Sequence, residues 1–263
     1  MPYFFANLRT VEKRLNKASE LLLFTDFDGT LASIQPTPQQ ANLSLETREK
    51  LKELSKKPNM KLIFVSGRSL KDLTTKIRLP NVIYAGCHGL EWLIENQYGR
   101  APMPNKTSKV FEVLKKKIKK EIRYQDVIIK DKGLSFSIHY RLLKEPDLSE
   151  FKWKMKEIIN VFSQTKEISV ISGKKVYEII PALRWNKGYF CKYILDRYRK
   201  HNQTQSSVYL GDDVTDEDAF LLLKDTITVK VGRKISSKAE YFLHDTSDVL
   251  RLLTWLCDQY GIK

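Results

Sequence analysis

The chain has 263 residues, 42% of them hydrophobic, and its 46 Lys and Arg outnumber its 31 Asp and Glu to give a net charge of +15. This size allows one large domain or two of ordinary size, with a sizeable core. No apolar stretch approaches the roughly 20 residues that span a bilayer, and the N-terminus lacks the apolar segment of a secretory signal, so we expect a cytoplasmic protein without membrane contact. The positive charge could attract nucleic acid, but no RNP, zinc-finger or basic-region pattern accompanies it, which disfavours this class.

The first apolar run, residues 21–25, predicts a buried strand, and a helix is expected from about Leu45. The runs 61–66 and 81–86 predict two more strands, separated by a helix that begins after Ser69. Short apolar runs that alternate with helical patterns are typical of a parallel sheet. We therefore expect this part of the chain to be α/β.

Two aspartates follow the first strand, in "TDFDGT". Asp26 and Asp28 at this spacing repel each other unless a cation, a shared proton or a ligand offsets the repulsion. Gly29 permits a tight turn, and Thr30 offers a hydroxyl group to an anion. The alternatives are a turn with solvated acids and a calcium loop, although the twelfth position from Asp26 is Thr37, where an EF-hand needs glutamate.

The second predicted strand ends at Ser66. Its hydroxyl group can donate a hydrogen bond to a phosphoryl oxygen, with the backbone amides at the start of the next helix helping. The sequence "SGR" that begins here is a weak signal when taken alone.

Isolated histidine and cysteine side chains carry little information. His88 and His139 belong to no metal-ligand spacing, so we interpret both as structural. The cysteines are odd in number, scattered and without a CxxC pair, which favours reduced, buried thiols over disulfides or a zinc site: Cys87, Cys191 and Cys257.

Between about Ala101 and Pro181 the pattern changes to helix, two strands, helix and two strands. The lysine-rich run 110–124 has apolar residues at helical spacing, which favours a solvated helix face. In residues 133–141 apolar and polar side chains alternate, which predicts a half-buried antiparallel strand with one face free for polar work. We expect an inserted αββαββ module, bracketed by candidate hinges at Pro102, Pro104 and Pro181.

The strand and helix pattern of the first part returns after the insert. It predicts helices over 187–200, 215–225 and 246–260 and strands over 206–212 and 226–232. We expect both parts to build one sheet. Lys187, at the start of a helix, could hold a compact positive charge over a phosphate or a nucleophilic carboxylate, although a lysine there is more often solvated.

A second acidic motif, "GDDVTDEDAF", follows the strand 206–212. Asp212 and Asp213 would meet Asp26 across the sheet edge and complete an oxygen-rich magnesium site. The alternative is a helix start enriched in acids, a description that suits Asp216 and its neighbour.

These four elements, in this order, resemble the haloacid-dehalogenase superfamily of phosphotransferases, with a Rossmann-like parallel-sheet core. The resemblance implies that Asp26 attacks phosphorus to form an aspartyl-phosphate, and that Asp28 protonates the leaving oxygen and then activates water. It also implies that Ser66 and Lys187 hold the phosphoryl group, while Asp26, Asp212 and the backbone carbonyl of Asp28 hold Mg²⁺. A carboxylate attacks a phosphate dianion only when positive charge offsets the repulsion, which agrees with these roles.

The chain is also similar to the trehalose-6-phosphate phosphatases in "AGCHGLEW", "KGLSFSIHYR", "KVYEIIPALRWNKG" and "GDDVTDEDAF". This resemblance covers nearly the whole chain and implies Mg²⁺-dependent hydrolysis of trehalose 6-phosphate. Lys132, Arg141 and Glu178 match positions at which an inserted cap grips sugar hydroxyls, although basic residues are common here and a surface pair is the alternative. Thr30 and Arg68 are the expected substrate contacts from the core.

We therefore predict an α/β, haloacid-dehalogenase-like core formed by residues 1–101 and 182–263, with an inserted α+β cap over residues 102–181. Asp213 and Asp216 are expected to support the metal site. Competing hypotheses are a phosphatase of another sugar phosphate, such as sucrose phosphate or mannosylglycerate phosphate, and a catalytically idle module that binds sugar phosphate. A trehalose-phosphate synthase is a candidate partner.

Overall fold

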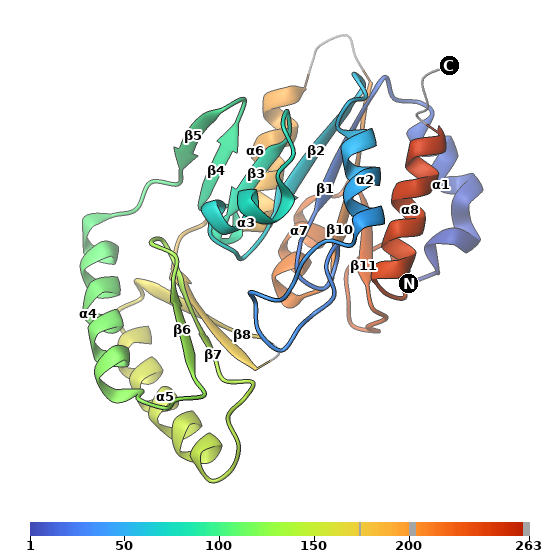
Figure 1. Cartoon of the computed structure of the whole chain (residues 1–263). Coiled ribbons are helices and arrows are strands. Elements are labelled where there is room, and N and C mark those ends of the chain that lie inside the picture. The colour runs from blue at the N-terminus through green and yellow to red at the C-terminus, as the bar shows by residue number, and fades with distance from the viewer. Residues whose placement is uncertain (174, 200–203, 260–263) are drawn as a thin grey trace. The chain divides into compact units, whose positions relative to one another are not determined.

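The computed structural model describes residues 1–173, 175–199 and 204–259 and divides the chain into two compact units (Figure 1). The first, here called the core unit, comprises Met1–Arg100 and Trp185–Lys263. The second, here called the inserted unit, is Ala101–Arg184. The sequence places these boundaries at 101/102 and 181/182, so the first boundary differs by one residue and the second by three.

Among the described residues, the core unit contains one eight-stranded sheet in the order β12-β11-β10-β1-β2-β3-β4-β5. Neighbouring strands from β12 to β3 are parallel, while β4 and β5 are antiparallel to their neighbours. The strands are β1 (Glu20–Thr25), β2 (Met60–Val65), β3 (Ile83–Gly86), β4 (Glu91–Ile94), β5 (Gln97–Arg100), β10 (Gln205–Gly211), β11 (Ile227–Val231) and β12 (Tyr241–Leu243). Because β1 pairs with β10 from Glu20↔Gln205 to Thr25↔Leu210, the prediction that both parts of the chain build one sheet is confirmed.

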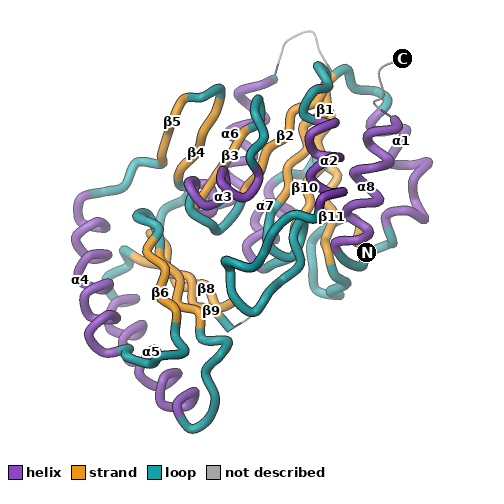
Figure 2. The backbone as a smooth tube through the Cα atoms, viewed as in Figure 1, coloured by secondary structure: helices purple, strands orange, loops and turns teal. Residues whose placement is uncertain are grey.

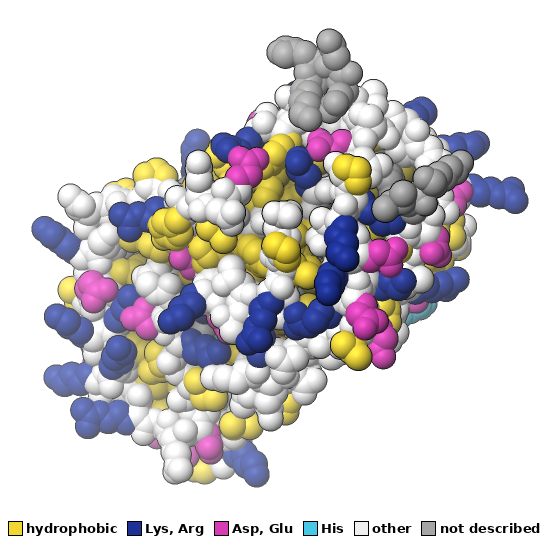
Figure 3. Space-filling model, turned by 45° about the horizontal axis from the view of Figure 1, so that its top comes forward, with side chains coloured by type: hydrophobic (Ala, Val, Ile, Leu, Met, Phe, Trp, Pro, Cys, Tyr) yellow, Lys and Arg dark blue, Asp and Glu magenta, His cyan; other side chains and the backbone are white. Residues whose placement is uncertain are grey.

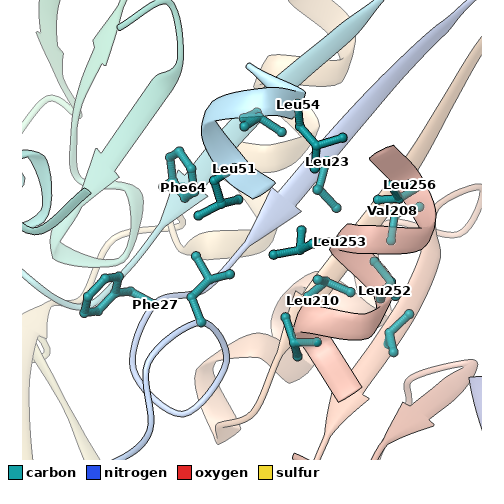
Figure 4. Close-up of a cluster of buried hydrophobic side chains, with 14 of the residues drawn as sticks. Leu23, Phe27, Leu51, Leu54, Phe64, Val208, Leu210, Leu252, Leu253 and Leu256 are labelled. Atoms are coloured by element: carbon teal, nitrogen blue, oxygen red, sulfur yellow. The ribbon is translucent and has the colours of Figure 1, made fainter. Parts of the chain in front are cut away.

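Helices cover both faces of this sheet. They are η1 (Phe4–Asn7), α1 (Leu8–Leu15), α2 (Leu45–Leu54), α3 (Leu70–Ile77), η2 (Cys87–Gly89), α6 (Lys187–Tyr198), η3 (Val214–Asp216), α7 (Glu217–Leu222) and α8 (Thr246–Gln259). Alternate side chains of β1 point to opposite faces: Leu23 packs with α2 and α8, and Phe24 packs with α6 and α7. Figure 4 shows the first of these clusters, with Leu51 and Leu253 facing the strands. A strand buried on both faces is apolar throughout, which explains the uninterrupted run that predicted β1.

Some elements of the core unit have no clear sequence signal. The β4–β5 hairpin turns at Glu95 and Asn96, which have φ angles of 51° and 63° without a glycine. In β5 three of the four residues are exposed, so no alternation marks it as a strand. The N-terminal helix α1 and the three-residue strand β12 were also not predicted, because both are short.

The inserted unit has the predicted order of helix, two strands, helix and two strands. Its elements are α4 (Asn105–Glu121), β6 (Ile128–Asp131), β7 (Phe136–His139), α5 (Asp147–Ser163), β8 (Ile168–Gly173) and β9 (Val176–Pro181). The strands form an antiparallel sheet in the order β6-β7-β9-β8. Phe111 of α4 and Phe151 of α5 pack with Phe136 of β7 on one face, where both helices lie (Figure 2). The predicted fold class, a parallel-sheet α/β core with an inserted α+β module, is confirmed.

One strand of the inserted unit differs from its prediction. The expected strand over 133–141 is shorter, and only Phe136–His139 is extended and paired. Ser135 and Ser137, expected on a face free for polar work, are fully buried. Alternation alone reports which side chains share a face, and it does not report whether something else covers that face.

The surface agrees with the solvated-helix interpretation of the lysine-rich run. In α4 the side chains of Phe111, Leu114 and Ile118 are buried, whereas Lys116 and Lys120 are exposed. On the face shown in Figure 3, Lys and Arg side chains are spread among acidic and apolar ones. No described helix combines the length and hydrophobicity that crossing a bilayer requires.

The inserted unit is expected to lose stability in acid through His139. Burial lowers the pKa of His139 from its ordinary value of 6.5 to about 4, and the positive charge of Lys132 acts in the same direction. As the pH falls through this window the unfolded chain takes up the proton first, so folding becomes less favourable. We expect the free energy of unfolding to fall less steeply between pH 6.5 and about 4 in His139→Gln than in the parent protein.

Thermal or urea unfolding across this pH range measures the difference. His244→Gln, at an exposed position of the core unit, is the control and should keep the parent slope. Identical slopes for His139→Gln and the parent protein would contradict the prediction.

Candidate active site

The predicted core residues come together at one edge of the large sheet. In the order β10-β1-β2 all three strands are parallel neighbours, so their carboxyl ends lie side by side. Asp26 directly follows β1, Ser66 follows β2 and Asp212 follows β10. Figure 2 shows the loops that leave this edge after β1 and β10.

Lys187 joins two carboxylates at this edge. Its Nζ atom donates hydrogen bonds of 2.8 Å to Oδ1 of Asp26 and of 2.8 Å to Oδ1 of Asp216. The hydroxyl group of Tyr209 donates to the same Asp216 oxygen at 2.7 Å. All four side chains are buried. Asn186 begins α6 by accepting a hydrogen bond from the Tyr189 amide, which places Lys187 in the first turn of the helix.

The electrostatics of this group follow from burial and pairing. Burial raises the pKa of Asp26 well above its ordinary value; Lys187 opposes this shift, and the charges of Asp216 and Asp212 add to it. Burial alone would lower the pKa of Lys187, but Asp216 and Asp26 outweigh it and raise this pKa. Lys187 therefore stays protonated. Asp216, whose pKa is lowered by Lys187, Tyr209 and the Asp213 amide in spite of its burial, is its ionised partner.

Three carboxylates at this edge can hold a metal ion. Asp26, Asp212 and Asp216 each offer an oxygen atom, and these atoms lie within 4.8 Å of one another. When ionised, these three side chains and Lys187 carry a net charge of −2, which a divalent cation balances. Oxygen-only ligands favour hard cations. Gly29 has φ +86°, and a Cβ atom there would collide with the carboxylate of Asp212, so this approach requires glycine.

Asp213 and Asp216 have different surroundings. Asp213 is partly buried and its backbone N–H donates to Oδ2 of Asp216 at 3.0 Å, while its own side chain caps η3. Asp216 is fully buried against Gly211, where a Cβ atom would collide with it. Asp216 does lie at an acid-rich helix start, as the alternative interpretation expects, but its carboxylate is buried and accepts a hydrogen bond from Lys187.

Asp28 is held by Arg68 through two hydrogen bonds. Nε of Arg68 donates to Oδ2 of Asp28 at 2.7 Å, and Nη2 donates to Oδ1 at 2.6 Å. The same guanidinium group donates to Asp72 at 2.6 Å and to the Pro38 carbonyl at 2.7 Å, and Arg68 is only 5% exposed. In this structure Arg68 thus orients Asp28, and the expected contact between Arg68 and substrate stays a prediction.

Thr30 and Ser66 are the predicted hydroxyl ligands of the phosphoryl group. Thr30 is fully buried, and its Oγ1 atom has no hydrogen-bond partner within the described part of the chain. Ser66 is also buried, and its Oγ atom accepts a hydrogen bond from the Arg68 amide at 3.2 Å. A buried hydroxyl group without a partner is rare and suits a site that receives a polar ligand.

Two amides at the start of α3 already have acceptors within the protein, and the expected help of the other amides with phosphate binding stays a prediction. The Leu70 N–H donates to Oε1 of Glu91 at 2.7 Å, and the Asp72 N–H donates to Oγ of Ser69 at 3.2 Å. These two donors are occupied inside the protein. The negative end of a glutamate side chain here takes the place that an anionic ligand takes at other helix starts.

A left-handed turn that the sequence did not reveal links the loops of the site. Cys87, His88 and Gly89 have consecutive positive φ angles of 49°, 60° and 91°. The Cys87 N–H donates to the Arg68 carbonyl at 2.7 Å, and the His88 N–H donates to the Ser66 carbonyl at 2.9 Å. The Gly89 carbonyl accepts from Nε1 of Trp185 at 2.6 Å, just before α6. The turn therefore ties the Ser66 loop to the helix that carries Lys187.

In the inserted unit the structure brings Lys132 and Glu178 together. Nζ of Lys132 donates to Oε1 of Glu178 at 2.7 Å, and both side chains are about one-tenth exposed. Glu178 lies on β9, opposite Ser137 of β7. Arg141, expected at the end of the strand over 133–141, lies in an exposed turn after β7, and Lys132 directly follows β6.

Sequence reasoning missed two polar residues close to the site, Tyr209 and Lys230. Tyr209 supports Asp216 as described, and Lys230 of β11 donates to the backbone carbonyls of Asp212 and Asp213. The signal that could have found Lys230 is its place in "ITVKV", where it is the one charged residue of a short strand rich in β-branched residues. Lysine is almost never fully buried unless it is paired.

Comparisons with known proteins agree with this geometry. The trehalose-phosphatase family model matches residues 24–249. Probable trehalose-phosphate phosphatase E of Arabidopsis thaliana is 26% identical, over 97% of this chain and 76% of the relative. Two solved structures share the fold. The C-terminal domain of a trehalose-6-phosphate phosphatase of C. albicans is 24% identical, with a TM-score of 0.82 over 98% of both chains. The sucrose-phosphatase of Synechocystis is 16% identical, with a TM-score of 0.56 over 90% of this chain and 97% of that one. Because the family model covers most of the chain, including every residue of the site at the sheet edge, the protein belongs to the trehalose-phosphatase family.

Proposed function

We propose that this protein hydrolyses trehalose 6-phosphate to trehalose and phosphate through an aspartyl-phosphate on Asp26. The observation that carries the proposal is the buried group in which Lys187 bonds to Asp26 and Asp216 beside Asp212. The family match supports the substrate. Another sugar phosphate, such as sucrose phosphate or mannosylglycerate phosphate, is the alternative, because the residues at the sheet edge are assigned to the phosphoryl group and the metal ion and not to the sugar.

In the first step a carboxylate oxygen of Asp26 attacks phosphorus. An O–P bond forms, the ester bond to the sugar breaks, and the leaving oxygen takes a proton from Asp28. In the second step water attacks the aspartyl-phosphate, Asp28 accepts the water's proton, and phosphate leaves. Both oxygens of Asp28 accept hydrogen bonds from Arg68 in this structure, so one of these bonds must break when Asp28 carries the proton that it gives to the leaving oxygen. Ser66 and Thr30 are assigned to the phosphoryl oxygens, since Thr30 has an unused hydroxyl group in the described structure.

The donor set at the sheet edge fits a divalent cation, which we propose to be Mg²⁺. Asp26, Asp212 and the backbone carbonyl of Asp28 would hold it, and it would offset the repulsion between the carboxylate and the phosphate. Asp216 is close enough to be a further ligand, but one of its oxygens already binds Lys187 and Tyr209 and the other binds the Asp213 amide. We therefore assign Asp216 to positioning Lys187.

We propose that the inserted unit acts as a cap and supplies specificity. Lys132, Arg141 and Glu178 would bind the sugar hydroxyls, because a site that contacts only phosphate and metal cannot distinguish phosphomonoesters. The structure pairs Lys132 with Glu178, as the alternative interpretation expects, with both side chains about one-tenth exposed. A ligand that separated the two without bonding to both would leave a charge unpaired, and discrimination between sugars could rest on this cost. A cytoplasmic location and a trehalose-phosphate synthase partner stay predictions.

Replacing the nucleophile is expected to abolish turnover and to keep the fold. Asp26→Asn preserves the shape of the side chain but removes the attacking charge, so phosphate release from trehalose 6-phosphate should become undetectable. Asp196→Asn, an exposed aspartate of α6 that pairs with Lys192, is the control and should retain activity. Substantial turnover by a folded Asp26→Asn protein would exclude the covalent mechanism.

Phosphate release from a panel of sugar phosphates, with and without Mg²⁺, tests the function as a whole. We expect trehalose 6-phosphate to be the best substrate, and activity to vanish after metal removal and to return with Mg²⁺. Ca²⁺ should inhibit, because its larger and more flexible shell can take both oxygens of Asp26 and occupy the attacking one. Full activity in excess chelator would contradict the metal assignment, and a preference for sucrose phosphate would select the alternative substrate.

Loss of the Lys132–Glu178 pair should slow the hydrolysis of trehalose 6-phosphate but not that of a small aryl phosphate. In Glu178→Ala we expect kcat/KM for trehalose 6-phosphate to fall by roughly 10²-fold or more, as for a lost charge-assisted contact. A small aryl phosphate, which never uses the sugar contacts, should be hydrolysed almost as before. Glu167→Ala is the control, since Glu167 pairs with Lys106 and Thr107 elsewhere in the same unit. Equal losses on both substrates would show that Glu178 serves folding instead of recognition.

A further inference from the structure

Lys230 is a buried cation beneath the acidic loop of the site. It lies in β11, next to β10, with 3% of its surface exposed. Its Nζ atom donates hydrogen bonds to the backbone carbonyl of Asp212 and, at 3.2 Å, to that of Asp213. The mechanism proposed above does not use this residue.

The two bonds from Lys230 constrain the direction of Asp212. Carbonyl groups of consecutive residues that point at one ammonium group fix the peptide unit between them, and with it the backbone that carries the Asp212 side chain. That side chain lies against Gly29, where not even a Cβ atom would fit. The Asp212 carboxylate oxygen lies within 4.8 Å of an oxygen of Asp26. A small displacement of the loop would therefore move this candidate metal ligand away from Asp26.

The charges around Lys230 also point to the acidic site. Glu217 lies 3.8 Å from Nζ, and the charges of Asp216, Glu217, Asp212 and Asp213 all stabilise the protonated form. Burial acts against them and lowers the pKa of Lys230. A valine or isoleucine would fill this strand without the cost of burying a charge, so the packing of β11 does not by itself account for a lysine. Two carbonyls and a surrounding group of carboxylates do account for it.

We propose that Lys230 is a positioning residue for the metal site: it holds the loop 212–213 so that Asp212 presents its carboxylate oxygen beside Asp26. This inference rests on the proposed metal-dependent function. Lys230 touches neither the substrate nor the reacting atoms and acts through Asp212. Groups that orient a metal ligand set the affinity of the site, and their loss costs about 10- to 100-fold in metal binding.

Direct metal binding to Lys230→Met, without substrate, tests the inference. Methionine keeps the length of the side chain but lacks the donors, so titration calorimetry with Mg²⁺, and electron paramagnetic resonance with Mn²⁺, should show affinity weakened by about tenfold or more. Lys115→Met is the matched control. Lys115 is similarly buried, pairs with Asp131 at 3.0 Å and donates to the Gly133 carbonyl, but lies in the inserted unit. It should lose thermal stability and keep the parent affinity for Mg²⁺.

Lys230→Arg provides a second readout if the methionine variant does not fold. Arginine retains the charge and N–H donors, so it should bind Mg²⁺ more tightly than Lys230→Met or Lys230→Gln and restore part of the parent affinity. Unchanged or tighter Mg²⁺ binding in a folded Lys230→Met or Lys230→Gln protein would overturn the positioning role. Absence of Mg²⁺ binding to the parent protein would instead refute the proposed function, so the two failures are distinguishable.

Discussion

The salt bridges that Lys187 makes with Asp26 and Asp216 are the interaction on which the site depends. Removing an ion from water costs several kcal/mol, and burying carboxylates together adds their mutual repulsion. Two 2.8 Å hydrogen bonds from one ammonium group, and a third donor from Tyr209, offset this cost. The negative charge that remains is what allows the three carboxylates to hold a metal ion. The same few atoms thus affect both metal binding at the site and the stability of the fold.

The order of the strands in the large sheet brings the residues of the site together. Asp26, Ser66 and Asp212 are far apart in sequence, yet each follows a strand, and those strands are adjacent and parallel. The chain needs no long loops to collect them. The left-handed turn at Cys87–Gly89 bonds to the Ser66 loop through its backbone and accepts a hydrogen bond from Trp185, two residues before α6, so the position of Lys187 is coupled to that of the Ser66 loop. A rigid frame of this kind suits chemistry that relies on charge placement.

The sequence predicted those features that have a local signal. Paired carboxylates after an apolar run are informative because their repulsion has few physical explanations, and Asp26, Asp28 and Asp212 lie where strand ends were expected. Partners that come from another part of the chain were not predictable: nothing in "SGR" shows that Arg68 binds Asp28. The hairpin β4–β5 was not predicted, because a strand at an exposed edge of the sheet needs no alternation of apolar and polar residues. The burial of Ser137 was not predicted, because alternation of apolar and polar residues shows which side chains share a face of the strand but not whether that face is covered.

The discontinuity of the core unit has a consequence for the order in which the chain folds. The inserted unit is one continuous segment, Ala101–Arg184, whose strand pairs are all formed within it. The central pairing of the core, by contrast, joins Glu20 to Gln205 across the whole insert. During synthesis β1 therefore leaves the ribosome long before its partner β10 exists. The backbone groups on the edge of β1 that pairs with β10 stay unpaired until then. A chain built in this way gains from an insert that folds early, because a compact insert shortens the effective loop that the pairing of β1 with β10 has to close.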